Sequence, residues 1–294
     1  MYLRRKVLLG LVEAFGGRLT ATDCHKLMFL LCQRASQNYY DFFPHKYGAY
    51  SLTLAQDKIR LTTLGFLAAG DVFQLRSEGF LSKLDQRTQS VIRSLVAEYD
   101  NTRGSALLKK VYVDYPYFAI KSQVAQQILS ARDFARVTDK INTDNSPCLF
   151  TIGYEGITID RYLEILINNN VAALVDVRKN PISKKYGFSK SQLQKAVQII
   201  EIDYIHLPEL GVPSHLRVGL NTKHDYETLF EYYDREVLPA RQEALSRLRS
   251  VIFEKERVAL TCFEASPFSC HRHRIAHYFE QDSNLNVPIV HLKA

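Results

Sequence analysis

The segment from Cys262 to Arg272 gathers most of the reactive side-chain types of this chain. Within eleven residues it holds two thiols, a carboxylate, an imidazole and a guanidinium: Cys262, Glu264, Cys270, His271 and Arg272. An apolar run, 258–261, precedes it, and a helix-like run begins at Ile275. In an open α/β sheet, a strand–loop–helix junction of this kind lies at the carboxyl end of a strand, where such folds place their sites.

The two thiols of this segment have three interpretations. In the first, Cys262 is a buried strand residue, since free cysteine packs as a small hydrophobic residue, and Cys270 and His271 cap the helix. Cys262, Cys270 and His271 are also zinc ligand types, but they lack the paired C-x₂₋₄-C spacing of structural zinc sites, so no metal or cofactor is predicted. A reactive thiolate at Cys270 is the third interpretation, because a helix N-terminus beside His271 and Arg272 is expected to lower a thiol pKa.

Composition and cysteine usage place the chain among globular proteins of a reducing compartment. The chain has 294 residues, enough for two domains, and no apolar run approaches the length of a membrane span. Its five irregularly spaced cysteines do not form a disulfide framework. The basic and apolar N-terminus is interrupted by Glu13 and has helical spacing, which favours a first helix over a signal sequence. We expect a cytoplasmic protein with no membrane partner.

The positive charge of the chain lies in its first half. Residues 1–146 contain 20 Lys and Arg against 13 Asp and Glu, whereas residues 147–294 contain 18 of each. A basic domain of this kind is typical of modules that dock DNA or RNA, and a protein partner is the alternative. Seven of the nine histidines lie in the second half, which predicts that the chemistry resides there.

The first 138 residues predict a mostly helical, winged-helix-like domain. A first helical stripe ends at Gly16-Gly17, and a second helix follows a capping box at 20–23. Ser51 can cap a third helix through Leu64, and residues 65–75 resemble a short hairpin. The apolar residues of the first two helices are Val7, Leu8, Leu11, Val12 and Phe15, then Leu27, Met28, Leu30 and Leu31. Further helices are predicted at about 82–100, 104–113 and 120–135. The aromatic cluster between Tyr39 and Tyr50 favours core packing over stacking on unpaired bases.

The second half predicts an α/β domain after a polar linker at 139–147. Strands and helices alternate from residue 148 to 294, which indicates a mainly parallel, doubly wound sheet. The strands are expected at 148–153, 171–177, 204–207, 258–262 and 287–292, with one long helix running from about 226 to 249.

Polar clusters follow four of these strands, and the ends of parallel strands meet at one edge of a sheet. The sequence therefore predicts one site there. The expected acid–base residues are Glu155, Asp176, Glu209, Glu264 and His271. The expected substrate- or anion-binding residues are Tyr154, Arg178, Ser183, His206, Arg217, Cys262, Cys270 and Arg272.

The same motifs resemble those of the family numbered 488 among domains of unknown function. They are Thr151-Ile-Gly-Tyr-Glu-Gly, Asp176-Val-Arg-Lys-Asn-Pro, Lys184-Lys-Tyr-Gly-Phe-Ser, Leu207-Pro-Glu-Leu-Gly and Cys262-Phe-Glu…Pro267…Cys270-His-Arg. The resemblance covers residues 148–294 and implies a polar site without naming a reaction. The first domain loosely resembles the helical SocA/Panacea antitoxin type through Lys26-Leu-Met-Phe-Leu-Leu, Phe43-Pro-His-Lys-Tyr-Gly-Ala-Tyr-Ser and Asp114-Tyr-Pro-Tyr-Phe.

Three functions fit these observations. The first is a nucleic-acid-directed hydrolase or glycosylase that processes or excises a base or nucleotide, with the first domain docking DNA or RNA. The second is a DNA- or protein-binding regulator with a ligand-sensing α/β domain. The third is thiol or sulfur chemistry at Cys270. We expect charge and hydrogen bonding, above all from Arg272, to matter more than sulfur.

Overall fold

The computed structural model describes residues 1–35, 37–282, 285 and 287–293. The chain divides into two compact units, Met1–Ile141 and Asn142–Ala294. The division falls inside the polar stretch 139–147. No helix in the described part of the chain is long and apolar enough to cross a membrane.

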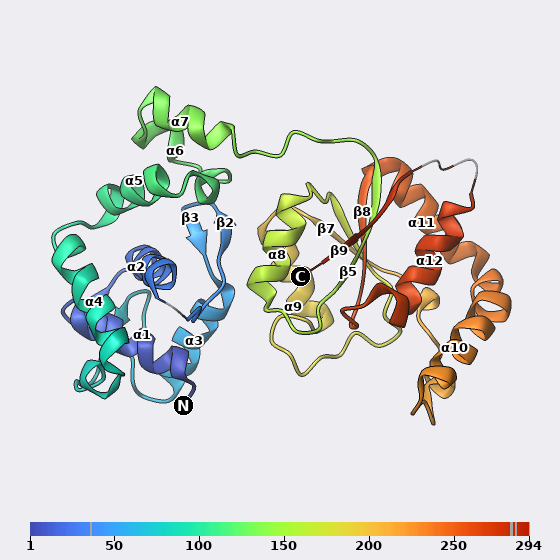
Figure 1. Ribbon diagram of the computed structural model, residues 1–294, viewed down its shortest axis with the longest axis horizontal. Coiled ribbons are helices and arrows are strands. Elements are labelled where there is room, and N and C mark those ends of the chain that lie inside the picture. The colour runs from blue at the N-terminus through green and yellow to red at the C-terminus, as the bar shows by residue number, and fades with distance from the viewer. Residues whose placement is uncertain (36, 283–284, 286, 294) are drawn as a thin grey trace. The chain divides into compact units, whose positions relative to one another are not determined.

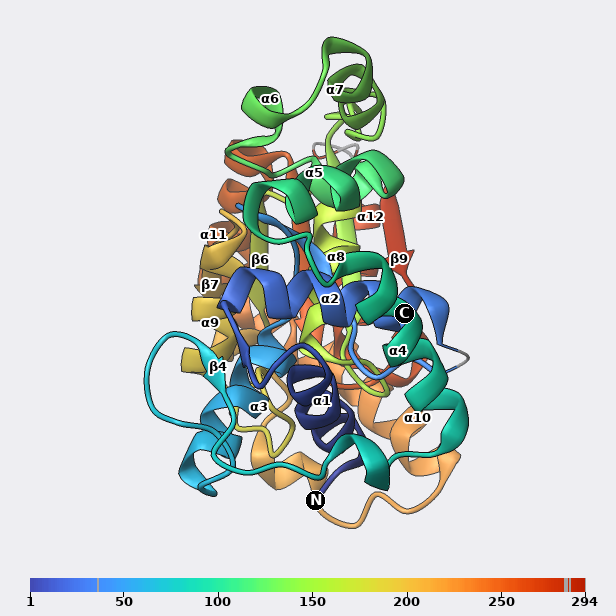
Figure 2. The ribbon, with the colours of Figure 1, turned by 90° about the vertical axis from the view of Figure 1, so that its left-hand side faces the viewer.

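The first unit is helical, as the sequence predicts, and is built around α2 (Ala21–Arg34). Helix α2 packs against α1 (Leu3–Ala14), α4 (Gln86–Tyr99) and α5 (Gly104–Asp114), as Figure 2 shows. The hydroxyl of Thr20 accepts a hydrogen bond from the Asp23 amide and thereby caps the start of α2. Ser51 caps α3 (Leu52–Thr63) in the same way.

Two small antiparallel pairs complete this unit. Strand β2 (Phe43–His45) pairs with β3 (Gly48–Tyr50), and Tyr40, Phe42 and Phe43 are buried. The core-packing interpretation of the aromatic cluster is therefore confirmed for these rings. Leu67 forms an antiparallel bridge with Leu75 within the expected 65–75 hairpin. Strand β4 (Phe73–Gln74) of the same segment also pairs with β1 (Arg18–Leu19).

The prediction of one helix at 120–135 is wrong. Two short helices stand there, α6 (Ala125–Ile128) and α7 (Ala131–Thr138). Leu129 is extended, and the Ser130 hydroxyl accepts from the Asp133 amide to begin α7. An N-cap inside a helical pattern restarts the helix rather than continuing it.

The second unit is a parallel sheet covered on both faces, which confirms the predicted α/β class. Its strand order is β7-β6-β8-β5-β9, and every pairing is parallel. The strands are β5 (Cys148–Gly153), β6 (Ala173–Asp176), β7 (Asp203–His206), β8 (Arg257–Cys262) and β9 (Ile289–Leu292). Figure 1 shows α8 (Ile159–Asn168) and α9 (Lys190–Ile199) on one face of the sheet, with α11 (Gln242–Lys255) and α12 (His271–Glu280) on the other.

The long helix predicted from 226 to 249 is interrupted. Helix α10 (Lys223–Tyr232) passes into a π-helical turn, Tyr233–Val237, and then into a 3₁₀ turn that begins at Pro239. Proline lacks an amide hydrogen and clashes with the preceding turn, so the α-helical ladder cannot pass through it. Helix α11 starts afresh after this break, which leaves α10 beside the polar edge of the sheet.

A lysine lies in the core of the first unit. Lys26 is only 2% exposed, and its Nζ donates to the Ala49 carbonyl oxygen over 2.7 Å. Burial lowers the pKa of Lys26 to about 7, although the carboxylate of Asp23 acts in the opposite direction. In the unfolded chain the same pKa is about 10.4, so between pH 7 and 10 the unfolded state binds more protons.

The free energy of unfolding should therefore rise with pH across this window, and Lys26→Met should remove the rise. The gain of the methionine variant over the wild type should be largest near pH 7 and shrink by up to about 1.4 kcal/mol per pH unit toward pH 10. Urea unfolding of both proteins at pH 7 and pH 9.5 measures the difference. A difference that stays constant with pH would contradict the buried-lysine account.

Candidate functional site

The strand order places a crevice at the carboxyl edge of the sheet. Strands β6 and β8 are neighbours, yet the chain leaves β6 for α9 on one face and β8 for α12 on the other. Such a divergence is the position at which open α/β sheets bind ligands. A pocket of about 420 Å³ lies there, and its size is that of a small-molecule or nucleotide site. It is lined by Tyr154, Arg178, Asn180, Ile182, Ser183, Lys184, Val212, Arg217, Leu220, Tyr226, Leu229, Phe230, Cys262, Phe263, Glu264, Ser269, Cys270 and His271.

Close backbone packing brings the β8–α12 loop onto the end of β5. Gly153 lies opposite Cys262 in the parallel register. A Cβ atom on Gly153 would lie 1.9 Å from the carbonyl oxygen of Glu264, so only glycine admits this approach. The amides of Tyr154 and Glu155 both donate to the Phe263 carbonyl, at 3.1 and 2.9 Å.

Two charged residues hold this loop in place. The Arg272 guanidinium is 1% exposed and donates to the carbonyl oxygens of Glu264 and Ala265 over 2.6 and 3.0 Å. The Glu155 carboxylate accepts from the Ala265 amide over 2.9 Å. Neither side chain lines the pocket. The structure thus places Arg272 and Glu155 on the loop backbone and outside the pocket lining, whereas the sequence predicts an anion-binding and an acid–base role for them.

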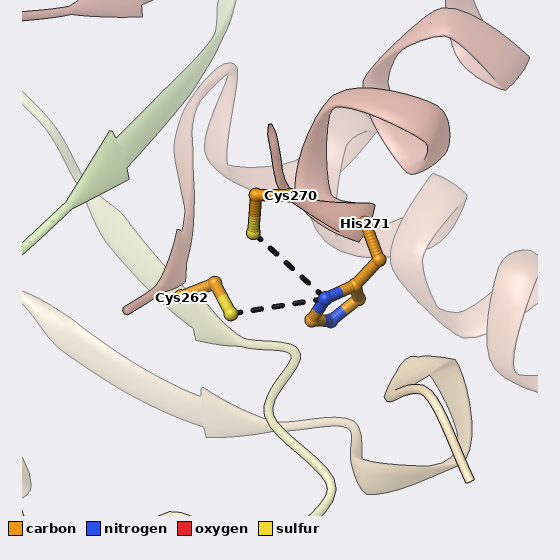
Figure 3. Close-up of side chains that lie close together, drawn as sticks. All are labelled: Cys262, Cys270 and His271. Carbon is orange, nitrogen blue, oxygen red and sulfur yellow. Dashed lines mark hydrogen bonds between the residues drawn. The ribbon is translucent and has the colours of Figure 1, made fainter. Parts of the chain in front are cut away.

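The floor of the pocket holds a buried cluster of two thiols and an imidazole, shown in Figure 3. The Nδ1 atom of His271 lies 3.7 Å from Cys262 Sγ and 3.8 Å from Cys270 Sγ. On the other side of the ring, Nε2 lies 3.0 Å from the Val177 carbonyl oxygen. A carbonyl can only accept, so Nε2 carries the proton in the neutral ring and Nδ1 presents its lone pair to both sulfurs.

Glu264 adds a carboxylate to this cluster. Cys262 Sγ lies 3.4 Å from Glu264 Oε2 and donates to it. Burial alone would raise the pKa of Glu264, but hydrogen bonding from Cys270 and attraction to His271 bring it below its ordinary value. Glu264 is therefore ionised at neutral pH.

The thiol of Cys270 is not activated by its position at the start of α12. Burial, followed by the neighbouring Cys262, raises the pKa of Cys270 well above its ordinary value. His271 acts in the opposite direction but does not offset the effect of burial. Cys270 is a protonated thiol at neutral pH when the cluster holds no metal.

Asp176 and Arg178 form a buried pair behind the pocket. Asp176 is fully buried and accepts from the Arg178 amide, from two nitrogens of the Arg178 guanidinium and from the Tyr204 hydroxyl. The remaining nitrogen of that guanidinium donates to the Tyr154 hydroxyl and the Phe188 carbonyl. Asp176, for which the sequence predicts an acid–base role, does not line the pocket and is the buried counter-ion of Arg178.

The other predicted residues divide between the pocket and its surroundings. Tyr154, Ser183 and Arg217 line the pocket together with Cys262, Cys270, His271, Glu264 and Arg178. His206 does not, because its Nε2 donates to the Arg178 carbonyl and its Nδ1 accepts from Lys190. Glu209 lies in a separate hollow beside Arg241.

The sequence interpretation missed one wall of the pocket. Tyr226, Leu229 and Phe230 come from α10, and Lys184 comes from the β6–α9 loop. Lys184 begins one of the sequence motifs and follows the strand that ends at Asp176, so its place at the pocket could have been predicted. The α10 residues carry no such signal, because their place depends on the break at Pro239.

The fold and the pocket define the second unit as a parallel α/β domain with a polar site at the carboxyl edge of its sheet. Residues 158–279, all within the second unit, match the model of the family described as Domain of unknown function DUF488. The matched range includes the Cys262–Arg272 loop but begins after Tyr154 and Glu155. No curated protein and no solved structure matched the chain.

The buried pair behind the pocket should control the stability of this unit. Asp176→Asn leaves the Arg178 charge buried without its counter-ion, so we expect the free energy of unfolding to fall by about 3–5 kcal/mol. Glu236→Gln, which breaks an exposed ion pair with Arg235, should change it by less than about 1 kcal/mol. Urea unfolding of the full chain measures both. Equal, small effects would show that the Asp176–Arg178 pair does not support the fold.

Proposed function

We propose that the second unit is a hydrolytic enzyme that excises or processes a base or nucleotide of nucleic acid, and that the basic first unit docks the DNA or RNA. The observation that carries the proposal is the composition of the pocket. A single carboxylate, Glu264, stands at the floor among the described lining residues, while cationic and aromatic side chains surround the mouth.

The mouth of the pocket suits a phosphate-bearing ligand. Lys184 and Arg217 line it, and both side chains are exposed. Such side chains neutralise backbone phosphates and position a strand without reading its sequence. The net charge of +7 in residues 1–146 supplies a second, sequence-independent attraction to the same polymer.

The aromatic side chains at the pocket suit an unstacked base. Phe263 and Tyr226 are 45% and 42% exposed although both are large rings. Base–aromatic stacking contributes about 1–3 kcal/mol per base and tolerates any sequence. Enzymes that act on a base take it out of the stack into a pocket of this kind.

Glu264 is the candidate general base. Its low pKa keeps it ionised, and it lines the pocket, so it can orient and activate a water against the bound nucleotide. His271 is less suited to proton transfer with a substrate, because both of its ring nitrogens already contact protein atoms. The raised pKa of Cys270 argues against the sulfur-chemistry alternative.

Glu264→Gln should separate binding from turnover. The amide keeps the size of the side chain but cannot take a proton, so we expect single-turnover rates to fall by about 10²–10⁴-fold with oligonucleotide affinity unchanged. The measurement uses full-length protein and single-stranded DNA and RNA oligonucleotides, each carrying one standard or modified base. Chromatography detects the released base or nucleotide.

Removing the two exposed cations of the pocket should weaken oligonucleotide binding, in contrast to Glu264→Gln. Lys184→Ala combined with Arg217→Ala should weaken binding and lower the slope of log affinity against log salt by about 1.4, since each neutralised phosphate contributes about 0.7 on single strands. Lys195→Ala removes one charge from an exposed position outside the pocket and is the matched control. Binding without release of any product would contradict the enzyme proposal and favour a ligand-sensing regulator. Absence of binding at micromolar protein would contradict the nucleic-acid proposal.

A further inference from the structure

We propose that Cys262, Cys270 and His271 form a zinc site at the floor of the pocket. These three residues are the group in the described part of the chain whose metal-ligating atoms all lie within 4.8 Å of one another, and all three are buried. This site is independent of the reaction proposed above, because the ligand geometry does not rest on any substrate.

The distances within the cluster agree with tetrahedral zinc. Zn–S bonds of about 2.3 Å and Zn–N bonds of about 2.0–2.1 Å place sulfur and nitrogen about 3.6 Å apart in a tetrahedral site. The two sulfur–nitrogen separations are 3.7 and 3.8 Å. The sulfur–sulfur distance is within 4.8 Å, so all three ligand atoms lie near enough to share one ion.

The histidine ring is already oriented as a metal ligand. Its Nε2–H donates to the Val177 carbonyl, which fixes the tautomer and leaves Nδ1 free of a proton. Ligating histidines almost always donate their other nitrogen to a carbonyl or carboxylate in this way. Figure 3 shows both sulfurs directed toward that same Nδ1 atom.

The fold explains why the sequence spacing conceals this site. Cys262 ends β8, whereas Cys270 and His271 begin α12, and the loop between them folds back over Gly153. The two thiols meet through this tertiary packing and not through a C-x₂₋₄-C turn. The C-x₂₋₄-C spacing describes ligands in such turns and not ligands that a folded loop brings together.

The site has the form of an open zinc site. Three protein ligands leave one tetrahedral position, and all three ligand residues line the pocket. A water from the pocket can take that position, as in sites with three protein ligands. Glu264 lies 3.4 Å from Cys262 Sγ but is not part of the group of three. Thiolate and imidazole ligands favour zinc over magnesium, calcium or manganese.

The test is the metal content and metal affinity of the full-length protein. The protein is purified under reducing conditions from zinc-supplemented medium, and elemental analysis should find about one zinc per chain. Cobalt added to the metal-free protein should give thiolate-to-cobalt charge-transfer absorption and the intense visible bands of a tetrahedral site. Competition with a chromophoric chelator then measures the zinc affinity.

Three variants and one control assign the ligands. Cys262→Ser, Cys270→Ser and His271→Gln should each lower zinc affinity by more than about 100-fold, because loss of even an outer-shell partner costs 10–100-fold. Cys148→Ser alters a buried cysteine of β5 outside the cluster and should leave zinc affinity unchanged. Circular dichroism reports whether each variant folds.

The wild-type measurement decides even if a variant fails to fold. No bound zinc, no tetrahedral cobalt spectrum, or an equivalent of a different metal would overturn the assignment. A disulfide between Cys262 and Cys270 that persists although reductant is present throughout purification would also overturn the zinc assignment. None of these readouts measures activity. The zinc assignment can therefore be contradicted without contradicting the proposed reaction, and the reaction can be contradicted without contradicting the zinc assignment.

Discussion

The approach of the Glu264 carbonyl to Gly153 is the contact on which the pocket depends. A Cβ atom at position 153 would overlap that oxygen, so the loop could not lie against the end of β5. Once the loop lies there, Arg272 and Glu155 secure its carbonyls and one of its amides. Close packing of backbone on backbone thus positions the side chains that face the pocket.

The charged residues of this edge fall into two groups by burial. Asp176, Arg178 and Arg272 are buried, and their charges face each other or backbone carbonyls. Lys184 and Arg217 are exposed at the pocket. The first group supports the architecture, because buried charges require fixed partners. The second group is free to meet a ligand in water.

The sequence predicted the fold of the second unit well, because alternating buried strands and helices leave a clear pattern. The five expected strands correspond to β5, β6, β7, β8 and β9 with small shifts at their ends. Helix boundaries were harder to predict where one residue decides them, as Ser130 and Pro239 do. The position of α10 followed from that second break, and with it one wall of the pocket.

The sequence predicted which edge of the sheet holds the pocket, but not which residues of that edge line it. Residue type and strand position bring Tyr154, Ser183, Glu264 and the cysteines to one edge, and the pocket contains them. Spacing does not reveal which way a side chain points. The sequence therefore predicted an anion-binding role for Arg272 and an acid–base role for Glu155, although both side chains contact the loop backbone. The meeting of Cys262 with His271 depends on tertiary packing, which a spacing rule cannot represent.

Amide hydrogen exchange of Gly153→Ala tests the central contact most directly. We expect faster exchange in peptides covering residues 262–272, because the added Cβ must displace the Glu264 carbonyl. Exchange in α2 of the first unit should stay unchanged and serves as the internal control. Unchanged exchange across 262–272 in a folded Gly153→Ala protein would contradict the claim that this approach builds the pocket.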